Sequence, residues 1–195
     1  MTGDKFYSIP NLLSLSRLVL VPVLIGLAVL GEGDAFLVLL AVSLLTDAFD
    51  GYLARKLNQT SELGARLDSW GDVLTYGAIV FALYWLWPDI FNQQAAYLMV
   101  AILSYLVPVA LAIRKFGEYP SYHTWAAKAT AVLMAPAFYV LTLTANDLLF
   151  RGVILFHVLV AFEEMAITAM LDKPKTNVRS VFHLDKQLKR EESRE

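Results

Sequence analysis

The chain has 195 residues, of which 57% are hydrophobic and only 17% are charged. This composition excludes an ordinary soluble domain of this size and indicates a protein whose solvent is lipid. The chain has no cysteine, which excludes disulfides, thiolate metal sites and cysteine nucleophiles. The net charge of −2 says little, because in a membrane protein the placement of charges matters more than their sum.

Six apolar stretches follow one another along the chain, each long enough to cross a hydrocarbon core of about 30 Å. They cover 11–30, 35–56, 63–87, 95–113, 124–144 and 148–170. The sequence therefore predicts an all-α, polytopic membrane protein with six transmembrane helices, in which residues 1–171 form one membrane domain. We expect the first stretch to be kept as a span rather than cleaved, because no small-x-small site precedes the acidic turn at 31–34.

The basic residues predict the orientation. With both termini and the even-numbered loops on one side, 15 of the 16 Lys and Arg residues fall on that half, and Arg151 alone does not. Basic residues collect on the cytosolic side of membrane proteins. We therefore expect both termini in the cytosol and the protein in the inner (cytoplasmic) membrane.

The segment 172–195 has a different composition from the rest of the chain. It carries seven Lys and Arg against five Asp and Glu, with apolar residues at helical spacing after Pro174. These are Val178, Val181, Phe182, Leu184 and Leu188. A charged cytosolic tail is expected, and both a short interfacial helix and a frayed terminus fit this pattern.

Four aspartates lie inside the second and third stretches: Asp47, Asp50, Asp68 and Asp72. A charged side chain at this depth costs about 2.5–3.5 kcal/mol, so four without matching buried cations need a reason. Each pair occupies one helix face, separated by about 60° and about 40° at 100° per residue. If the two helices form an antiparallel hairpin, Asp47 comes level with Asp72, and Asp50 with Asp68. Oxygen ligands of this kind favour one or two Mg²⁺ or Mn²⁺ ions.

Small residues accompany these aspartates. Gly51 and Ala54 follow Asp50, and Gly64 precedes Asp68. Close helix packing explains any one of them. Together, beside four carboxylates, they favour a slot through which a flat, bulky group could reach the metals.

The fixed positions from Asp47 to Asp72 match a known signature. It consists of Asp47, Asp50, Gly51, Ala54, Arg55, Gly64, Asp68 and Asp72. At each of these positions the chain resembles the CDP-alcohol phosphotransferases. The opening run from Ile9 to Arg17 and the six-span layout are also similar to that family.

The resemblance implies roles for these residues. Asp47, Asp50 and Asp68 would bind two Mg²⁺ or Mn²⁺ ions that hold the CDP pyrophosphate. Asp72 would also reach the metal site and act as general base. The CDP moiety would be admitted by the small residues and fixed by a basic one, namely Gly51, Ala54, Gly64 and Arg55.

The resemblance also implies a reaction. The phosphatidyl group of CDP-diacylglycerol would pass to a small polar alcohol, with release of CMP, at a site that faces the cytosol. It further implies a homodimer, with membrane lipid and these substrates as partners and no nucleic acid.

The acceptor alcohol stays open between glycerol 3-phosphate, serine and inositol (phosphate). Ser69 and Val73 stand where glycerophosphate enzymes usually have Pro and Lys, and the run 67–77 looks more like the serine-using branch. For a phosphorylated acceptor, Lys128 and Arg114 are the candidate ligands. Glu163, Glu164 and His123 receive no role.

Two rival interpretations come from other classes. An ion-coupled membrane transporter explains intramembrane carboxylates, but not Gly51, Ala54, Arg55 and Gly64 at fixed spacing. A catalytically inactive scaffold does not explain why the signature is intact.

Overall fold

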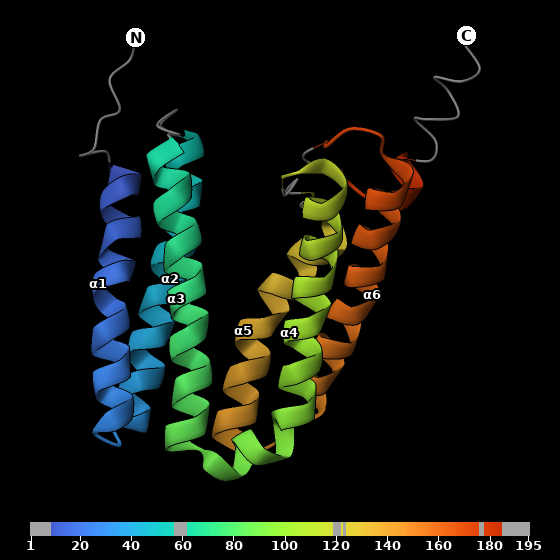
Figure 1. The fold of residues 1–195 in the computed structure, drawn as a ribbon. Coiled ribbons are helices and arrows are strands. Elements are labelled where there is room, and N and C mark those ends of the chain that lie inside the picture. The colour runs from blue at the N-terminus through green and yellow to red at the C-terminus, as the bar shows by residue number, and fades with distance from the viewer. Residues whose placement is uncertain (1–8, 57–61, 119–121, 123, 176–177, 185–195) are drawn as a thin grey trace, which may run out of the picture. The chain divides into compact units, whose positions relative to one another are not determined.

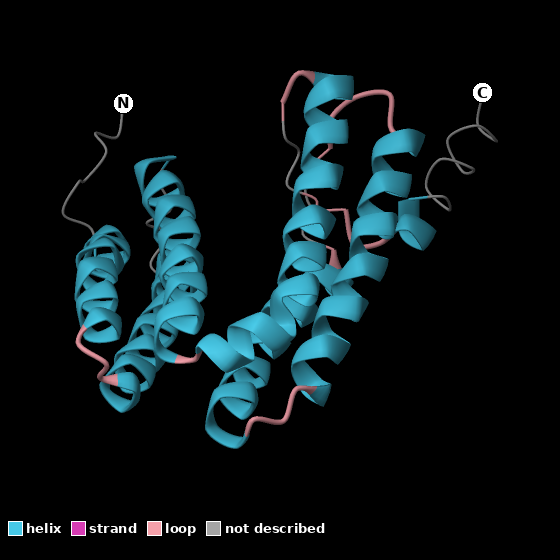
Figure 2. Cartoon of the chain, turned by 60° about the horizontal axis from the view of Figure 1, so that its bottom comes forward, coloured by secondary structure: helices cyan, strands magenta, loops and turns pink. Residues whose placement is uncertain are grey.

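The computed structural model describes residues 9–56, 62–118, 122, 124–175 and 178–184. These residues form six helices and no strand (Figures 1 and 2). The helices are α1 Ile9–Val29, α2 Gly33–Lys56, α3 Glu62–Leu86, α4 Pro88–Phe116, α5 Trp125–Thr144 and α6 Leu148–Met170. The prediction of an all-α protein is confirmed.

Three of these helices are long and apolar enough to cross a membrane: α4, α5 and α6. In α1 and α3 the described apolar segments, Ser14–Val29 and Trp70–Leu86, are shorter. The described residues thus contain three clear candidate spans, which supports a membrane protein.

The chain divides into two compact units, Met1–Asn92 and Gln93–Glu195. In the first unit, α1 packs against both α2 and α3 (Figure 1). Leu24 of α1 and Phe36 and Leu40 of α2 are fully buried there. The turn between α1 and α2 contains Gly31 with a φ of +79°, a left-handed conformation that glycine adopts without strain. Because α1 contacts both neighbours, one side chain on α1 can reach α2 and α3 together.

In the second unit, α5 packs against α6. Polar contacts join the start of α4 to the start of α6. Gln94 is 1% exposed; its Nε2 donates to Asp147 Oδ2 at 3.2 Å, and its Oε1 accepts from Arg151 Nε at 2.9 Å. Arg151 also pairs with Asp147, with Nη2 and Oδ2 2.6 Å apart, and lies over the ring of Tyr97. Arg151 is the one basic residue that the sequence predicts on the non-cytosolic side. Its ion pair with Asp147 gives it a structural role there.

The other end of α6 is contacted both by residues that precede it in the chain and by residues that follow it. Lys115 Nζ donates to the carbonyl oxygens of Thr168 and Ala169, both at 2.9 Å, so it satisfies acceptors that the end of a helix leaves open. Glu163 Oε1 accepts from the backbone N–H of Val181 at 3.2 Å. An apolar cluster joins Tyr122, Ile167, Leu171, Val178 and Leu184.

Tyr122 lies between α4 and α5 and is buried in this cluster. Its hydroxyl and Thr168 Oγ1 form a hydrogen bond of 2.8 Å. Burial raises the pKa of the Tyr122 phenol, so the hydroxyl keeps its proton at neutral pH. Phe182, in the short helical turn 181–184, is instead 77% exposed. His123 and Leu188 lie outside the described residues.

Candidate active site

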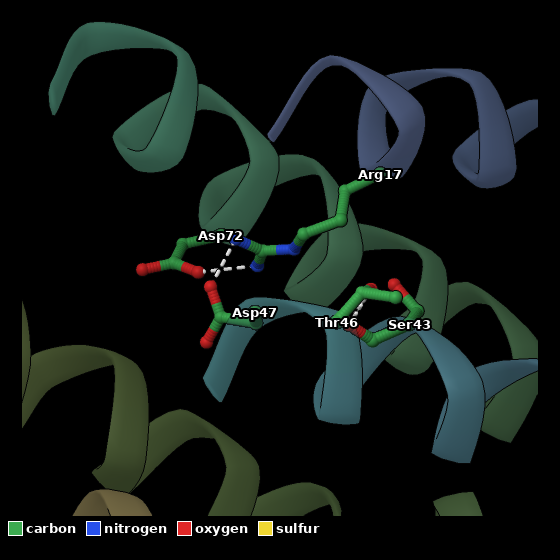
Figure 3. Close-up of polar contacts among 5 residues, drawn as sticks. All are labelled: Arg17, Ser43, Thr46, Asp47 and Asp72. Atoms are coloured by element: carbon green, nitrogen blue, oxygen red, sulfur yellow. Dashed lines mark hydrogen bonds and ion pairs between the residues drawn. The ribbon is translucent and has the colours of Figure 1, made fainter. Parts of the chain in front are cut away.

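A buried arginine from α1 joins two of the predicted aspartates. Arg17 is 1% exposed; its Nη1 donates to Asp47 Oδ1, and its Nη2 donates to Asp72 Oδ1 at 2.6 Å (Figure 3). Asp47 lies on α2 and Asp72 on α3. One guanidinium therefore links three helices at a single level of the bundle.

This level agrees with the hairpin register that the sequence predicts for Asp47 and Asp72. The prediction that the aspartates have no matching buried cation is wrong for these two. The cation comes from α1, a third helix, and its position beside α2 and α3 cannot be read from the spacing of residues within the hairpin. A signal was nevertheless present. An arginine inside the first apolar stretch is costly unless it is paired.

The carboxylates of this triad, Arg17–Asp47–Asp72, are more accessible than the arginine between them. The side chains of Asp47 and Asp72 are 35% and 46% exposed, against 1% for Arg17. Figure 3 shows the second oxygen of each carboxylate pointing away from Arg17. One positive and two negative groups leave the triad with one negative charge. Its accessible oxygens have the chemistry that Mg²⁺ and Mn²⁺ prefer, so these residues fit a hard divalent cation.

The other predicted site residues lie in the same two helices. Asp50, Gly51, Ala54 and Arg55 belong to α2, and Asp68 belongs to α3, but their side chains lie outside the described ones. Gly64 is half-buried in α3. Among the described residues no three potential metal-ligating side chains form a group. Because two of the four aspartates are not in that set, the four-carboxylate site stays a prediction.

Gly71 is a feature of the site that the sequence analysis missed. It is buried directly beside Arg17, and a Cβ added there would lie 3.4 Å from both Arg17 Cζ and Nη1. The guanidinium therefore packs closely against the backbone of α3. A Cβ at position 71 would just touch the guanidinium, and a longer side chain there would have to share its space.

Two buried hydroxyls lie one helical turn from the aspartates. Ser43, four residues before Asp47, is fully buried, and Thr75, three residues after Asp72, is 2% exposed. Within the described part of the chain neither side-chain oxygen has a hydrogen-bond partner. This is uncommon for buried polar atoms and marks the interior beside the triad as polar.

The two candidate acceptor ligands are exposed in the second unit. Arg114 lies in the last turn of α4. Lys128 lies in α5, with its Nζ 5.8 Å from the centroid of the Trp125 ring. Their role toward an acceptor stays a prediction.

Together these features define a helical membrane protein with a carboxylate site among its first three helices. The chain belongs to the CDP-alcohol phosphatidyltransferase family, whose sequence model matches residues 7–170.

Individual relatives carry two kinds of name. The CDP-diacylglycerol–glycerol-3-phosphate 3-phosphatidyltransferase of Aquifex aeolicus is 40% identical over 74 residues, which is 37% of this chain and 42% of the relative. The protein of the same name from Wigglesworthia glossinidia brevipalpis is 40% identical over 82 residues, 40% of this chain and 45% of the relative. The cardiolipin synthase (CMP-forming) of Streptomyces coelicolor is 32% identical over 148 residues, 72% of this chain and 67% of the relative.

The match to the first two relatives therefore spans less than half of their length. No solved structure matches the chain.

Proposed function

We propose that this protein transfers the phosphatidyl group of CDP-diacylglycerol to glycerol 3-phosphate and releases CMP. The observation that carries the proposal is the meeting of Asp47 and Asp72, the first and last aspartates of the family signature, on one guanidinium. The names of the relatives from Aquifex and Wigglesworthia support glycerol 3-phosphate as the acceptor.

A second acceptor has specific support. The relative that covers 72% of this chain is named a CMP-forming cardiolipin synthase. Cardiolipin consists of two phosphatidyl groups on one glycerol, so a CMP-forming route to it would use the lipid alcohol phosphatidylglycerol. Serine and inositol (phosphate) remain alternatives from the sequence, and an ion-coupled transporter is the alternative outside enzymes.

The site would hold its metals through Asp47, Asp50 and Asp68, with Asp72 beside them. Two Mg²⁺ or Mn²⁺ ions would neutralise the pyrophosphate and the departing CMP. Gly51, Ala54 and Gly64 would leave room for the cytidine nucleotide, and Arg55 would fix it.

Asp72 would act as the general base of a direct displacement. The acceptor hydroxyl gives its proton to the Asp72 carboxylate while its oxygen bonds to the phosphorus of the phosphatidyl group. The bond from that phosphorus to CMP breaks in the same step. Arg17 fixes Asp72 by its Oδ1 and so orients the carboxylate for this transfer.

The acceptor phosphate would be met by a basic residue at the cytosolic side. Lys128 and Arg114 are the candidates, because an ammonium or guanidinium forms strong charge-assisted hydrogen bonds with phosphate. The site would face the cytosol, in an inner-membrane protein of six spans with both termini in the cytosol. The support is the 15-to-1 distribution of Lys and Arg together with the three clear spans α4, α5 and α6.

We also propose that the protein forms a homodimer, as the family resemblance implies. Much of α4 is apolar and exposed, including Ile102, Leu106 and Ile113. Mass measurement in mild detergent and in nanodiscs should give twice the mass of one chain. A particle of one chain in both media would contradict the dimer.

The function is tested by CMP release from CDP-diacylglycerol with a panel of acceptors. Purified protein should release CMP with glycerol 3-phosphate and Mg²⁺ or Mn²⁺, and EDTA should abolish the release. The other members of the panel are phosphatidylglycerol, serine and inositol phosphate, and Asp47→Asn serves as the inactive control. No CMP release with any acceptor would contradict the transferase. Full turnover in EDTA would contradict the metal site.

A further inference from the structure

Arg17 is the buried basic partner of two signature aspartates, and beyond orienting Asp72 it has no part in the metal and substrate binding proposed above. A guanidinium carries N–H donors in a rigid, planar fork, so it can serve two carboxylates at once. Here Nη1 reaches Asp47 and Nη2 reaches Asp72. Gly71 of α3 lies beside the fork: a Cβ added there would be 3.4 Å from Cζ.

We propose that Arg17 is a built-in counter-charge: it holds Asp47 and Asp72 together in the metal-free protein and competes with the divalent cation for their negative charge. The inference rests on the proposed metal site. Without a cation between them, the two carboxylates would repel and separate or take up protons. With Arg17 in place, the ligand set stays assembled before any metal arrives.

The competition follows from the sign of the charges. Arg17 neutralises one of the two negative charges, so a divalent cation meets a weaker attraction than two bare carboxylates would offer. A neutral residue at position 17 removes this opposition. Metal binding should therefore tighten, while the metal-free protein loses stability because Asp47 and Asp72 lose the guanidinium that they share.

A purely structural role of Arg17 would give a different result. If Arg17 only fills space between helices, its replacement lowers stability by the same amount with and without metal. The shift in melting temperature produced by a ligand reports its affinity for the folded state. The Mn²⁺-induced shift therefore separates the two roles without any measurement of activity.

The experiment compares the full chain with Arg17→Met, Arg17→Lys and a control, Leu24→Ala, in nanodiscs. Leu24 lies on the same helix two turns away and is fully buried. Thermal unfolding is measured in EDTA and in saturating Mn²⁺, and Mn²⁺ affinity is measured by the electron paramagnetic resonance signal of the free ion.

Arg17→Met should show a larger Mn²⁺-induced rise in Tm than the wild type, and a Kd for Mn²⁺ lower by about threefold or more. Arg17→Lys should lie between the two, because it keeps the charge without the fork. Leu24→Ala should lose stability in both media with the wild-type rise in Tm and the wild-type Kd. A variant Arg17→Met that folds only with Mn²⁺ is the extreme form of the expected result. An unchanged or weaker Mn²⁺ response in Arg17→Met overturns the proposal.

A double-mutant cycle in EDTA gives a readout that needs no metal. The loss of stability caused by Arg17→Met should be smaller in an Asp47→Asn background than in the wild type, because one of the two carboxylates that pair with Arg17 is already neutral. Equal losses of stability in both backgrounds would overturn the proposal that Arg17 acts as a counter-charge.

The two proposals fail in different ways. A wild-type protein that does not respond to Mn²⁺ contradicts the metal site, and the competition with it. A wild-type response that Arg17→Met leaves unchanged contradicts Arg17 alone.

Discussion

The triad Arg17–Asp47–Asp72 places one positive charge deep in the bundle and two negative charges nearer its surface. Arg17 is 1% exposed, and its two partners are 35% and 46% exposed. This order suits a site that must bind cations, because the counter-charge lies behind the ligands and not in front of them. Arg17 contacts Oδ1 of each carboxylate. The residues of the signature have different proposed roles, so their replacement should have separable effects.

Asp72→Asn and Asp68→Asn test that separation. Asp68→Asn should weaken metal and CDP binding together, because an amide is a poorer ligand for a hard dication. Asp72→Asn should largely keep CDP affinity and slow the chemical step by about 10²–10⁴-fold, the usual contribution of a general base. CDP affinity and single-turnover rates at saturating Mn²⁺ measure both. If Asp72→Asn loses CDP binding as completely as Asp68→Asn, Asp72 is a ligand and not the base.

At Ser43 we expect a substitution that does not lower the stability of the protein. Its hydroxyl is fully buried and has no hydrogen-bond partner within the described part of the chain. Ser43→Ala should therefore leave stability unchanged or raise it by up to about 1–3 kcal/mol, the penalty of an unsatisfied buried polar group. Thermal unfolding of the purified variant in EDTA measures the change. A clear loss of stability would contradict this prediction and show that the hydroxyl has a hydrogen-bond partner.

At the scale of helices, most boundaries could be predicted from hydrophobicity alone. The stretches 124–144 and 148–170 differ from α5 and α6 by at most one residue. The start of α4 was harder to predict, because it precedes the apolar stretch 95–113 by seven residues and includes Asp89 and Gln94. Those polar residues look like a loop in the sequence. The structure places them in a helix because Pro88 suits a first turn and Gln94 finds polar partners on α6.

The packing of the helices against one another was harder to predict from the sequence than their boundaries. Spacing within one hairpin fixes which aspartates are level, so the pairing of Asp47 with Asp72 could be predicted. Which third helix lies against that hairpin depends on side chains distant in sequence. For this reason the contribution of Arg17 and the role of Gly71 could not be derived.

A substitution of Gln94 tests the polar contact between α4 and α6. It is 1% exposed and bonds with both Asp147 and Arg151. Gln94→Leu should lower the free energy of unfolding by about 1–3 kcal/mol, because buried partners lose their hydrogen bonds. The exposed neighbour Gln93 supplies the control, since Gln93→Leu should change stability little. Equal effects of the two substitutions in thermal unfolding would show that the network contributes nothing of its own.

At the scale of the whole molecule, the predicted topology decides whether the carboxylate site opens toward cytosolic substrates. The six-span prediction places the turn between α1 and α2 and the start of α4 outside the cell, and the residues after α6 inside. Glu32, Asp89 and Lys173 are exposed representatives of these three places. The chain contains no cysteine, so a single introduced cysteine can be labelled without background.

Glu32→Cys and Asp89→Cys should react with a membrane-impermeant maleimide added to intact cells, whereas Lys173→Cys should react only after the membrane is permeabilised. The physical reason is the positive-inside distribution, in which 15 of 16 basic residues share the cytosolic half. CMP release should persist in each variant, which shows that the labelled chains are folded. Labelling of Lys173→Cys alone in intact cells would invert the protein and place the aspartates at the outer face. Labelling of Glu32→Cys without Asp89→Cys would instead contradict the span count, because α2 and α3 would not both cross the membrane.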